Sequence, residues 1–313
     1  MRWVIAGVAL AVLGAGLWFW LSGGDRVVTA WALEGQRTAQ EAMAGALRRL
    51  RAGEPAAVAG LMSICFGYGF FHAAGPGHGK LLIGGYGAAR AVGAWRLSAV
   101  AMASSLAQGL TAIVLVGVGL WLIGWSREQM TDAADRFFAP LSFGAIALVG
   151  LWLAFRGARG LWRARQATAH AHDHNHGHGH HHDHDHTGDG HACSTCGHAH
   201  GPDPEALAQA TGPREVAALI AAIAVRPCTG ALFLLILTAQ LGVFWAGVAG
   251  TVAMSLGTAS VTVAVALASV GLRQGVLAGL AGGAALARVQ PWIELAVGAV
   301  VALLATQLAV AAL

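Results

Sequence analysis

Long uncharged apolar runs recur along this chain of 313 residues, and they constrain its fold more than any other feature. Roughly 20 helical residues cross a hydrocarbon core about 30 Å thick, so runs of this length predict transmembrane helices. The composition agrees, because 56% of the residues are hydrophobic and only 11% are charged, too few to cover a water-soluble globule of this size. We therefore expect an all-α fold, a polytopic bundle of membrane helices.

Seven runs are long enough to be spans. They are residues 3–21, 56–74, 97–124, 138–155, 216–237, 243–272 and 292–313. Residues 274–287 are also uncharged, but this run is short and rich in Gly and Ala, which favours a re-entrant or interfacial segment. The apolar core of the first run exceeds the 7–15 residues of a signal peptide, which favours a retained N-terminal anchor, residues 1–24, over a cleaved signal.

Residues 25–55 differ from the spans because arginines and glutamates alternate with apolar residues. Part of the apolar spacing is helical, as at Met43, Leu47 and Leu50. This pattern predicts an amphipathic segment that lies on the membrane surface.

The distribution of basic residues predicts the orientation of the spans. With the N-terminus inside, 11 Lys and Arg residues fall on the inner face and 7 on the outer face, which favours a cytoplasmic N-terminus. Three spans precede the segment 156–214 and three follow it, so the halves 56–155 and 215–313 run in opposite orientations. The layout predicts a 3+3 inverted repeat after the anchor span.

Each half carries a proline associated with its first span, Pro76 and Pro227. Interruptions in corresponding segments are typical of discontinuous helices around the central site of a secondary transporter. The alternative is that each proline only kinks a helix, which membrane proteins tolerate.

Two histidines and the single lysine of the chain stand at the end of the second span, in His72-Ala-Ala-Gly-Pro-Gly-His78-Gly-Lys80. Ionisable groups are costly there and usually functional. The Gly-Pro-Gly turn breaks the helix, so it can bring His72 and His78 to one metal ion. Neutral imidazole suits Ni²⁺, Co²⁺, Cu²⁺ and Zn²⁺, and ligand type alone does not choose among them. Lys80 either belongs to the same path or extends to the lipid headgroups.

Two further motifs lie in the second half, Arg226-Pro-Cys228-Thr-Gly-Ala and Ser255-Leu-Gly-Thr258-Ala. Arg226 lies within a span, where an arginine costs about 2.5–3.5 kcal/mol, so we expect it to face protein or water. Cys228, together with Cys65 of the first half, either offers a thiolate to a soft metal or serves as a small apolar residue. Ser255 and Thr258 lie on one helical face, which fits a polar path or interhelical hydrogen bonds.

Together, the three motifs resemble those of the NicO family of nickel/cobalt transporters, and within it the RcnA-type efflux branch. The resemblance implies a membrane transporter, not an enzyme, that exports Ni²⁺ and Co²⁺ from the cytoplasm and provides metal tolerance and homeostasis. It also implies that the metal ion is cargo, with no prosthetic group. We expect the protein in the inner (plasma) membrane of the cell.

A polar tract separates the two halves. Between residues 170 and 200 the chain has 13 His, four Asp and a pair of Cys, and no Lys or Arg occurs from 166 through 213. This composition binds divalent metals and cannot form a core, so it predicts a His-rich cytoplasmic loop, residues 156–214. Candidate ligands, for one tetrahedral site or for a looser metal collector, are His191, Cys193, Cys196, His198 and His200.

Other functions compete with the export of nickel and cobalt. His-rich loops also occur in exporters and importers of other divalent metals such as zinc. A membrane thiol–disulfide electron carrier would use Cys65 and Cys228, but it would leave His72 and His78 without a role. The basic residues lie between apolar blocks, which excludes a nucleic-acid partner. No G-x-x-x-x-G-K-[ST] motif is present, so the predicted transport uses a gradient or a partner.

Overall fold

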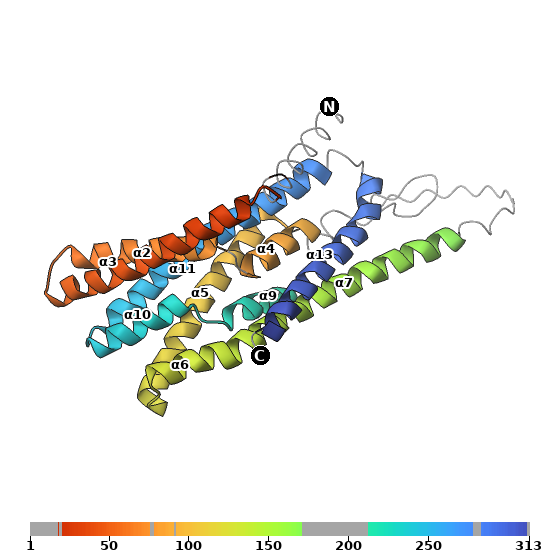
Figure 1. The fold of residues 1–313 in the computed structure, drawn as a ribbon. Coiled ribbons are helices and arrows are strands. Elements are labelled where there is room, and N and C mark those ends of the chain that lie inside the picture. Colours follow the sequence, from red (N-terminus) through yellow and green to blue (C-terminus); the bar gives the residue numbers. More distant parts are fainter. Residues whose placement is uncertain are drawn as a thin grey trace, which may run out of the picture.

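The computed structural model describes residue 18 and residues 21–75, 78–90, 92–170, 212–277 and 283–311. Within these residues every regular element is a helix, which confirms the predicted all-α bundle (Figure 1). Most of the predicted first span, 3–21, lies outside the described residues. So does the His-rich stretch 171–211, with the candidate ligands His191, Cys193, Cys196, His198 and His200.

The described chain forms ten α-helices, which are α2 (Gly24–Arg51), α3 (Ala57–Ala74), α4 (His78–Ala89), α5 (Ala94–Val118), α6 (Arg127–Ala133), α7 (Ala139–His170), α9 (Pro213–Ala224), α10 (Thr229–Gln240), α11 (Phe244–Leu272) and α13 (Gly283–Ala311). Three π-helical segments extend them, η1 (Gly119–Ile123) after α5, η2 (Ala134–Phe138) between α6 and α7, and η3 (Arg273–Leu277) after α11.

Six of the seven predicted spans have counterparts in the described structure. Five stretches are long and apolar enough to cross a membrane, and they are Ala57–Ala74, Ala94–Ile123, Arg127–Gln166, Phe244–Gly275 and Val289–Val310. The predicted span 216–237 is divided between α9 and α10, which bend by 62° at their break. The interruption predicted at Pro227 is thereby confirmed, and its cause is that proline cannot continue the backbone hydrogen bonds of a helix.

The long helices pack in pairs through glycines. Helices α7 and α13 lie side by side (Figure 1), and a Cβ atom on Gly150 or Gly157 of α7 would overlap the α13 backbone. Helix α11 packs on both α3 and α5, and its Gly257 lies against the backbone of Phe66 on α3. Small residues allow membrane helices to approach this closely. Helix α5 packs on α11 and α7 on α13, so helices of the two halves contact each other. The inverted repeat stays a prediction.

Replacing Gly257 by Val should destabilise the bundle, because a side chain there would overlap the backbone of Phe66 between α3 and α11. Overpacking of this kind typically costs about 1–3 kcal/mol. We expect the purified variant to melt at a lower temperature than the wild type in detergent. Gly271→Val is the control on the same helix, because the space around Gly271 is open. Equal melting temperatures for the two variants would contradict the packing.

Helix α2 corresponds to the amphipathic segment predicted for residues 25–55. It packs lengthwise along α3 (Figure 1), with the Trp31 ring 6.3 Å from that of Phe70 and 4.9 Å from that of Phe71. Protein covers part of the apolar face of α2, because Ala32, Met43, Ala46 and Leu47 are buried. The position of this segment on the membrane surface stays a prediction.

A cluster of buried charges joins α4, α7, α9 and α13. Arg90, which follows α4, has Nη2 at 3.5 Å from Oε2 of Glu215 and Nη1 at 3.9 Å from Oε1 of Glu294. The second oxygen of Glu294 lies 3.3 Å from Nε of Arg156. Tyr86 Oη donates a hydrogen bond to Glu215, at 2.6 Å. Arg90 and Glu294 are only 3% and 4% exposed, so these ion pairs offset the cost of burying charge inside the bundle.

Candidate functional site

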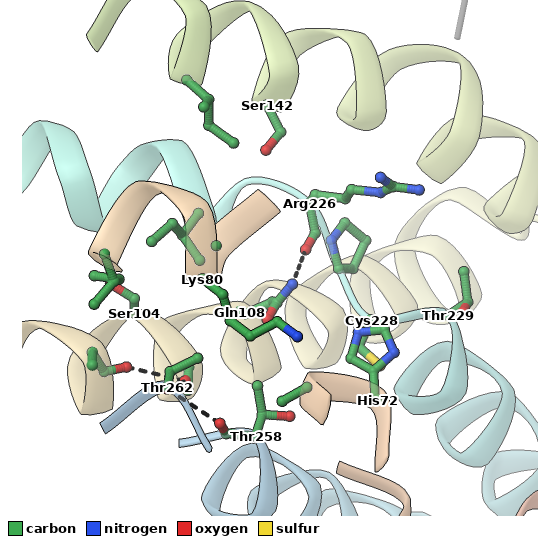
Figure 2. Close-up of a pocket in the computed structure, with 18 residues that line it drawn as sticks. His72, Lys80, Ser104, Gln108, Ser142, Arg226, Cys228, Thr229, Thr258 and Thr262 are labelled. Carbon is green, nitrogen blue, oxygen red and sulfur yellow. Dashed lines mark hydrogen bonds between the residues drawn. The ribbon is translucent and has the colours of Figure 1, made fainter. Parts of the chain in front are cut away.

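A cavity of about 230 Å³ lies where α3 and α4 meet the broken span formed by α9 and α10 (Figure 2). Helices of both halves contribute to its wall, including α3 and α4 from the first half and α9, α10 and α11 from the second. Five of the predicted site residues line it, and they are His72, Lys80, Arg226, Cys228 and Thr258. The fold therefore brings together residues that lie up to 186 positions apart in the sequence.

His72 and Cys228 meet at the wall of this cavity. His72 lies in the last turn of α3, and its ring stacks on that of Tyr68 with centroids 6.1 Å apart and planes 9° from parallel. Cys228 is the residue that precedes α10, and its thiol faces the His72 imidazole within reach of a hydrogen bond (Figure 2). The thiol also lies near the backbone N–H groups at the start of α10, the positive end of the helix dipole.

Lys80 lines the cavity from α4 and contacts the end of α3. Its Nζ donates hydrogen bonds to the backbone oxygen of Ala74, at 3.1 Å, and to that of Gly75. Carbonyl groups in the last turn of a helix lack hydrogen-bond donors within the helix, and Lys80 provides a donor for them here. The lysine therefore stabilises the break between α3 and α4 as well as placing a positive charge at the cavity.

Arg226 stands at the break between α9 and α10. Its guanidinium lies over the ring of Phe143 on α7, 5.0 Å from the ring centroid. Its backbone oxygen accepts a hydrogen bond from Nε2 of Gln108 on α5, at 2.9 Å. Gln108 was not among the predicted site residues, because a lone glutamine in a span resembles any other interhelical contact. In the structure it holds the irregular segment against α5.

The other predicted residues separate into two environments. Thr258 lines the cavity, and its Oγ1 donates to the backbone oxygen of Gly69, at 3.2 Å. Ser255 lies outside the cavity lining and packs against Gly109 between α11 and α5. Cys65 is fully buried in the apolar core and also lies outside the cavity lining. Cys65 and Cys228 are both free thiols.

His78 is the first residue of α4, but its side chain and residues 76–77 lie outside the described part of the structure. The pairing of His72 and His78 on one ion thus stays a prediction. Among the described side chains, no three His, Cys, Asp or Glu residues come together as metal ligands. The donors that the described cavity offers to a transition metal are the imidazole of His72 and the sulfur of Cys228.

Gln36 of α2 contacts the site although sequence reasoning missed it. Its Oε1 lies 3.1 Å from Nδ1 of His72, and its Nε2 lies 3.4 Å from the backbone oxygen of Ala32. No motif surrounds Gln36, and 36 positions separate it from His72. The available signal was its position on the same helical face as the buried residues Ala32 and Met43.

One known protein family matches most of this chain. The profile of the NicO family, described as a high-affinity nickel-transport protein, matches residues 58–313. The chain belongs to the NicO family. This membership confirms the family that the three motifs resemble, and it places the chain among membrane transporters of metal ions.

One relative from Haemophilus influenzae bears the name "Putative nickel/cobalt efflux system". It is 28% identical over 199 residues, which cover 63% of this chain and 61% of the relative. The chain therefore matches about three fifths of the length of that relative. No solved structure matches the chain.

The NicO match begins at the second residue of α3 and continues through α13, so it includes all the cavity-lining residues. It begins after α2, which ends at Arg51. Gln36 is therefore a contact to the site from outside the matched NicO region.

Proposed function

We propose that this chain is a secondary-type transporter that exports Ni²⁺ and Co²⁺ from the cytoplasm and supports metal tolerance and homeostasis. The observation that carries the proposal is the meeting of His72 and Cys228 at a cavity beside the broken span α9–α10 of a NicO-family bundle. Imidazole nitrogen and thiolate sulfur are both good donors for these late first-row ions. The name of the Haemophilus relative, an efflux system, supports the direction.

Metal binding at this pair requires the unprotonated forms of both side chains. A thiolate and a neutral imidazole are the ligands, so an arriving ion displaces the proton of the Cys228 thiol. Each cycle would then exchange protons for the metal at the site, as a gradient-driven transporter requires. Rocking of the two halves about the cavity would expose it alternately to the two sides of the membrane.

We place the protein in the inner membrane with the N-terminus and the His-rich loop in the cytoplasm. The excess of Lys and Arg on that side, 11 against 7, supports this orientation. The loop would then gather metal on the side from which an exporter draws it, through His191, Cys193, Cys196, His198 and His200. His78, at the start of α4, is proposed as a further ligand beside His72.

The electron-carrier alternative has less support than metal transport. A dithiol carrier needs two thiols that meet, whereas Cys65 lies in the apolar core and Cys228 in the cavity wall. Zinc and other divalent ions use the same donors as nickel and cobalt, so experiment must separate them.

Expression of the protein in a bacterial host should lower cell-associated Ni²⁺ and Co²⁺ and raise tolerance to both ions. The metal content of cells with and without the protein is measured by mass spectrometry at several external concentrations of Ni²⁺, Co²⁺ and Zn²⁺. Increased accumulation of Ni²⁺ or Co²⁺ on expression would refute export. An effect confined to Zn²⁺ would instead assign the protein to zinc transport.

A further inference from the structure

We propose that Gln36 of α2 is a positioning residue that holds the proton of His72 on Nδ1 and leaves Nε2 as the metal-binding atom. The inference rests on the proposed function, because it gives His72 the role of a ligand. It adds to that function a residue that lies before position 58, where the NicO match begins.

The hydrogen bonds of the Gln36 amide determine which nitrogen carries the proton. Its Nε2 is directed at the carbonyl oxygen of Ala32, at 3.4 Å, and its Oε1 is at 3.1 Å from His72 Nδ1. The reversed amide would place two acceptor oxygens against each other. An amide oxygen can only accept a hydrogen bond, so Nδ1 of His72 is the donor. A neutral imidazole has a single N–H, and its lone pair for a metal is therefore on Nε2.

The surroundings of the ring fix its orientation. Gln36 occupies Nδ1, Tyr68 stacks on one face of the ring, and the Cys228 thiol approaches from the cavity side (Figure 2). With Nδ1 occupied by α2, the remaining nitrogen is the one available to an ion bound by Cys228. Histidine ligands commonly donate their second N–H to such a partner, and loss of that partner typically costs 10–100-fold in metal affinity.

Helix α2 is held firmly enough to serve this role. A Cβ atom on Gly35 would overlap the ring of Phe71, so the α2 backbone lies directly on the aromatic residue beside His72. Ala32, which accepts the hydrogen bond from Gln36, also packs near Gly75, the residue that follows α3. The residues that orient the Gln36 amide therefore pack against the same helix end that carries His72.

The test is Ni²⁺ and Co²⁺ binding to the purified full chain in detergent, by calorimetry and by the absorption spectrum of bound Co²⁺. The binding that His72→Ala lacks defines the cavity site and separates it from binding by the His-rich loop. Gln36→Met keeps the length of the side chain but removes the carbonyl oxygen, and Gln36→Glu keeps an accepting oxygen. We expect Gln36→Met to bind 10–100-fold more weakly than the wild type and to alter the Co²⁺ spectrum. Gln36→Glu should retain binding. Gln40→Met, one turn further along α2 at an exposed position, should bind like the wild type.

His72→Ala, measured alongside, separates this inference from the proposed function. Unchanged binding by His72→Ala would overturn the proposed metal site itself. Loss of binding by His72→Ala with unchanged binding by Gln36→Met would overturn only the positioning role. Equal losses in Gln36→Met and Gln36→Glu would also overturn it, because they would assign Gln36 to packing.

A measurement on the unmutated site does not depend on how the variants fold. In ¹⁵N NMR of histidine-labelled protein without metal, the signals absent from His72→Ala identify the His72 ring. We expect those signals to show protonated Nδ1 and unprotonated Nε2. Protonation on Nε2 would overturn the inference.

Discussion

Replacing His72 by Ala should abolish the transport of Ni²⁺ and Co²⁺ while the protein remains folded in the membrane. Among the described side chains, His72 provides the one imidazole that lines the cavity, and Cys228 alone leaves an ion with a single strong donor there. The side chain is half-buried at the end of α3, so its loss does not open a gap in the apolar core. Efflux of radioactive nickel from preloaded cells measures the effect, with membrane content checked by immunoblot.

The two cysteines of the spans provide a matched pair of controls. Cys228→Ala should greatly reduce efflux, whereas Cys65→Ala should leave it near the wild-type level, because Cys65 lies outside the cavity lining. Normal efflux by His72→Ala would contradict the site. Loss of activity in Cys65→Ala, with His72→Ala still active, would favour the thiol–disulfide carrier.

Replacing Arg90 by Met should destabilise the fold by about 3–5 kcal/mol, the cost of removing one partner from a buried ion pair. Arg90 bridges Glu215 and Glu294, and its loss leaves Glu215 without the cation that faces it in the cluster, while Glu294 keeps Arg156. The expected result is a much lower melting temperature in detergent and a reduced yield of folded protein.

Arg37→Met is the matched control for Arg90. Arg37 of α2 also lies near two carboxylates, at 3.9 Å from Glu34 and 3.4 Å from Glu41, but its side chain is 70% exposed. Exposed ion pairs contribute about 0–1 kcal/mol, so this variant should melt close to the wild type. Similar melting temperatures for Arg90→Met and Arg37→Met would show that the buried cluster contributes little to folding.

The spans were predictable because the cost of placing a residue in lipid depends mainly on its own side chain. This reasoning did not predict the end of helix α7, which continues to His170 although the predicted span stopped at residue 155. Arg156 ends the apolar run, yet its charge is paired with Glu294 of α13. A local reading of the sequence cannot anticipate a partner 138 positions away.

The packing of α2 on α3 is a second feature that a local reading of the sequence does not predict. Its amphipathic pattern predicts a helix with one covered face, but lipid and protein cover an apolar face equally well. Contacts such as Trp31 on Phe71 show that α3 covers part of this face, and they join residues that the pattern does not relate.

Much of the candidate site could also be predicted. His72, Lys80 and Arg226 were singled out because polar groups in spans are costly, and the structure places all three at one cavity. The sequence favoured Cys228 over Cys65 as a metal ligand, but it could not show which thiol faces the cavity, since residue type says little about the direction of a side chain. Gln36 was missed because its contact with His72 depends on the packing of α2 along α3.

Inside-out membrane vesicles test the central claim most directly, that Ni²⁺ leaves the cytoplasm through the site formed by His72 and Cys228. Their outer face is the former cytoplasmic face, so an exporter carries added Ni²⁺ into them. Energised vesicles with the wild-type protein should accumulate Ni²⁺, and vesicles with His72→Ala should accumulate no more than vesicles without the protein. Accumulation only in right-side-out vesicles would contradict export, and equal accumulation by His72→Ala would contradict the site.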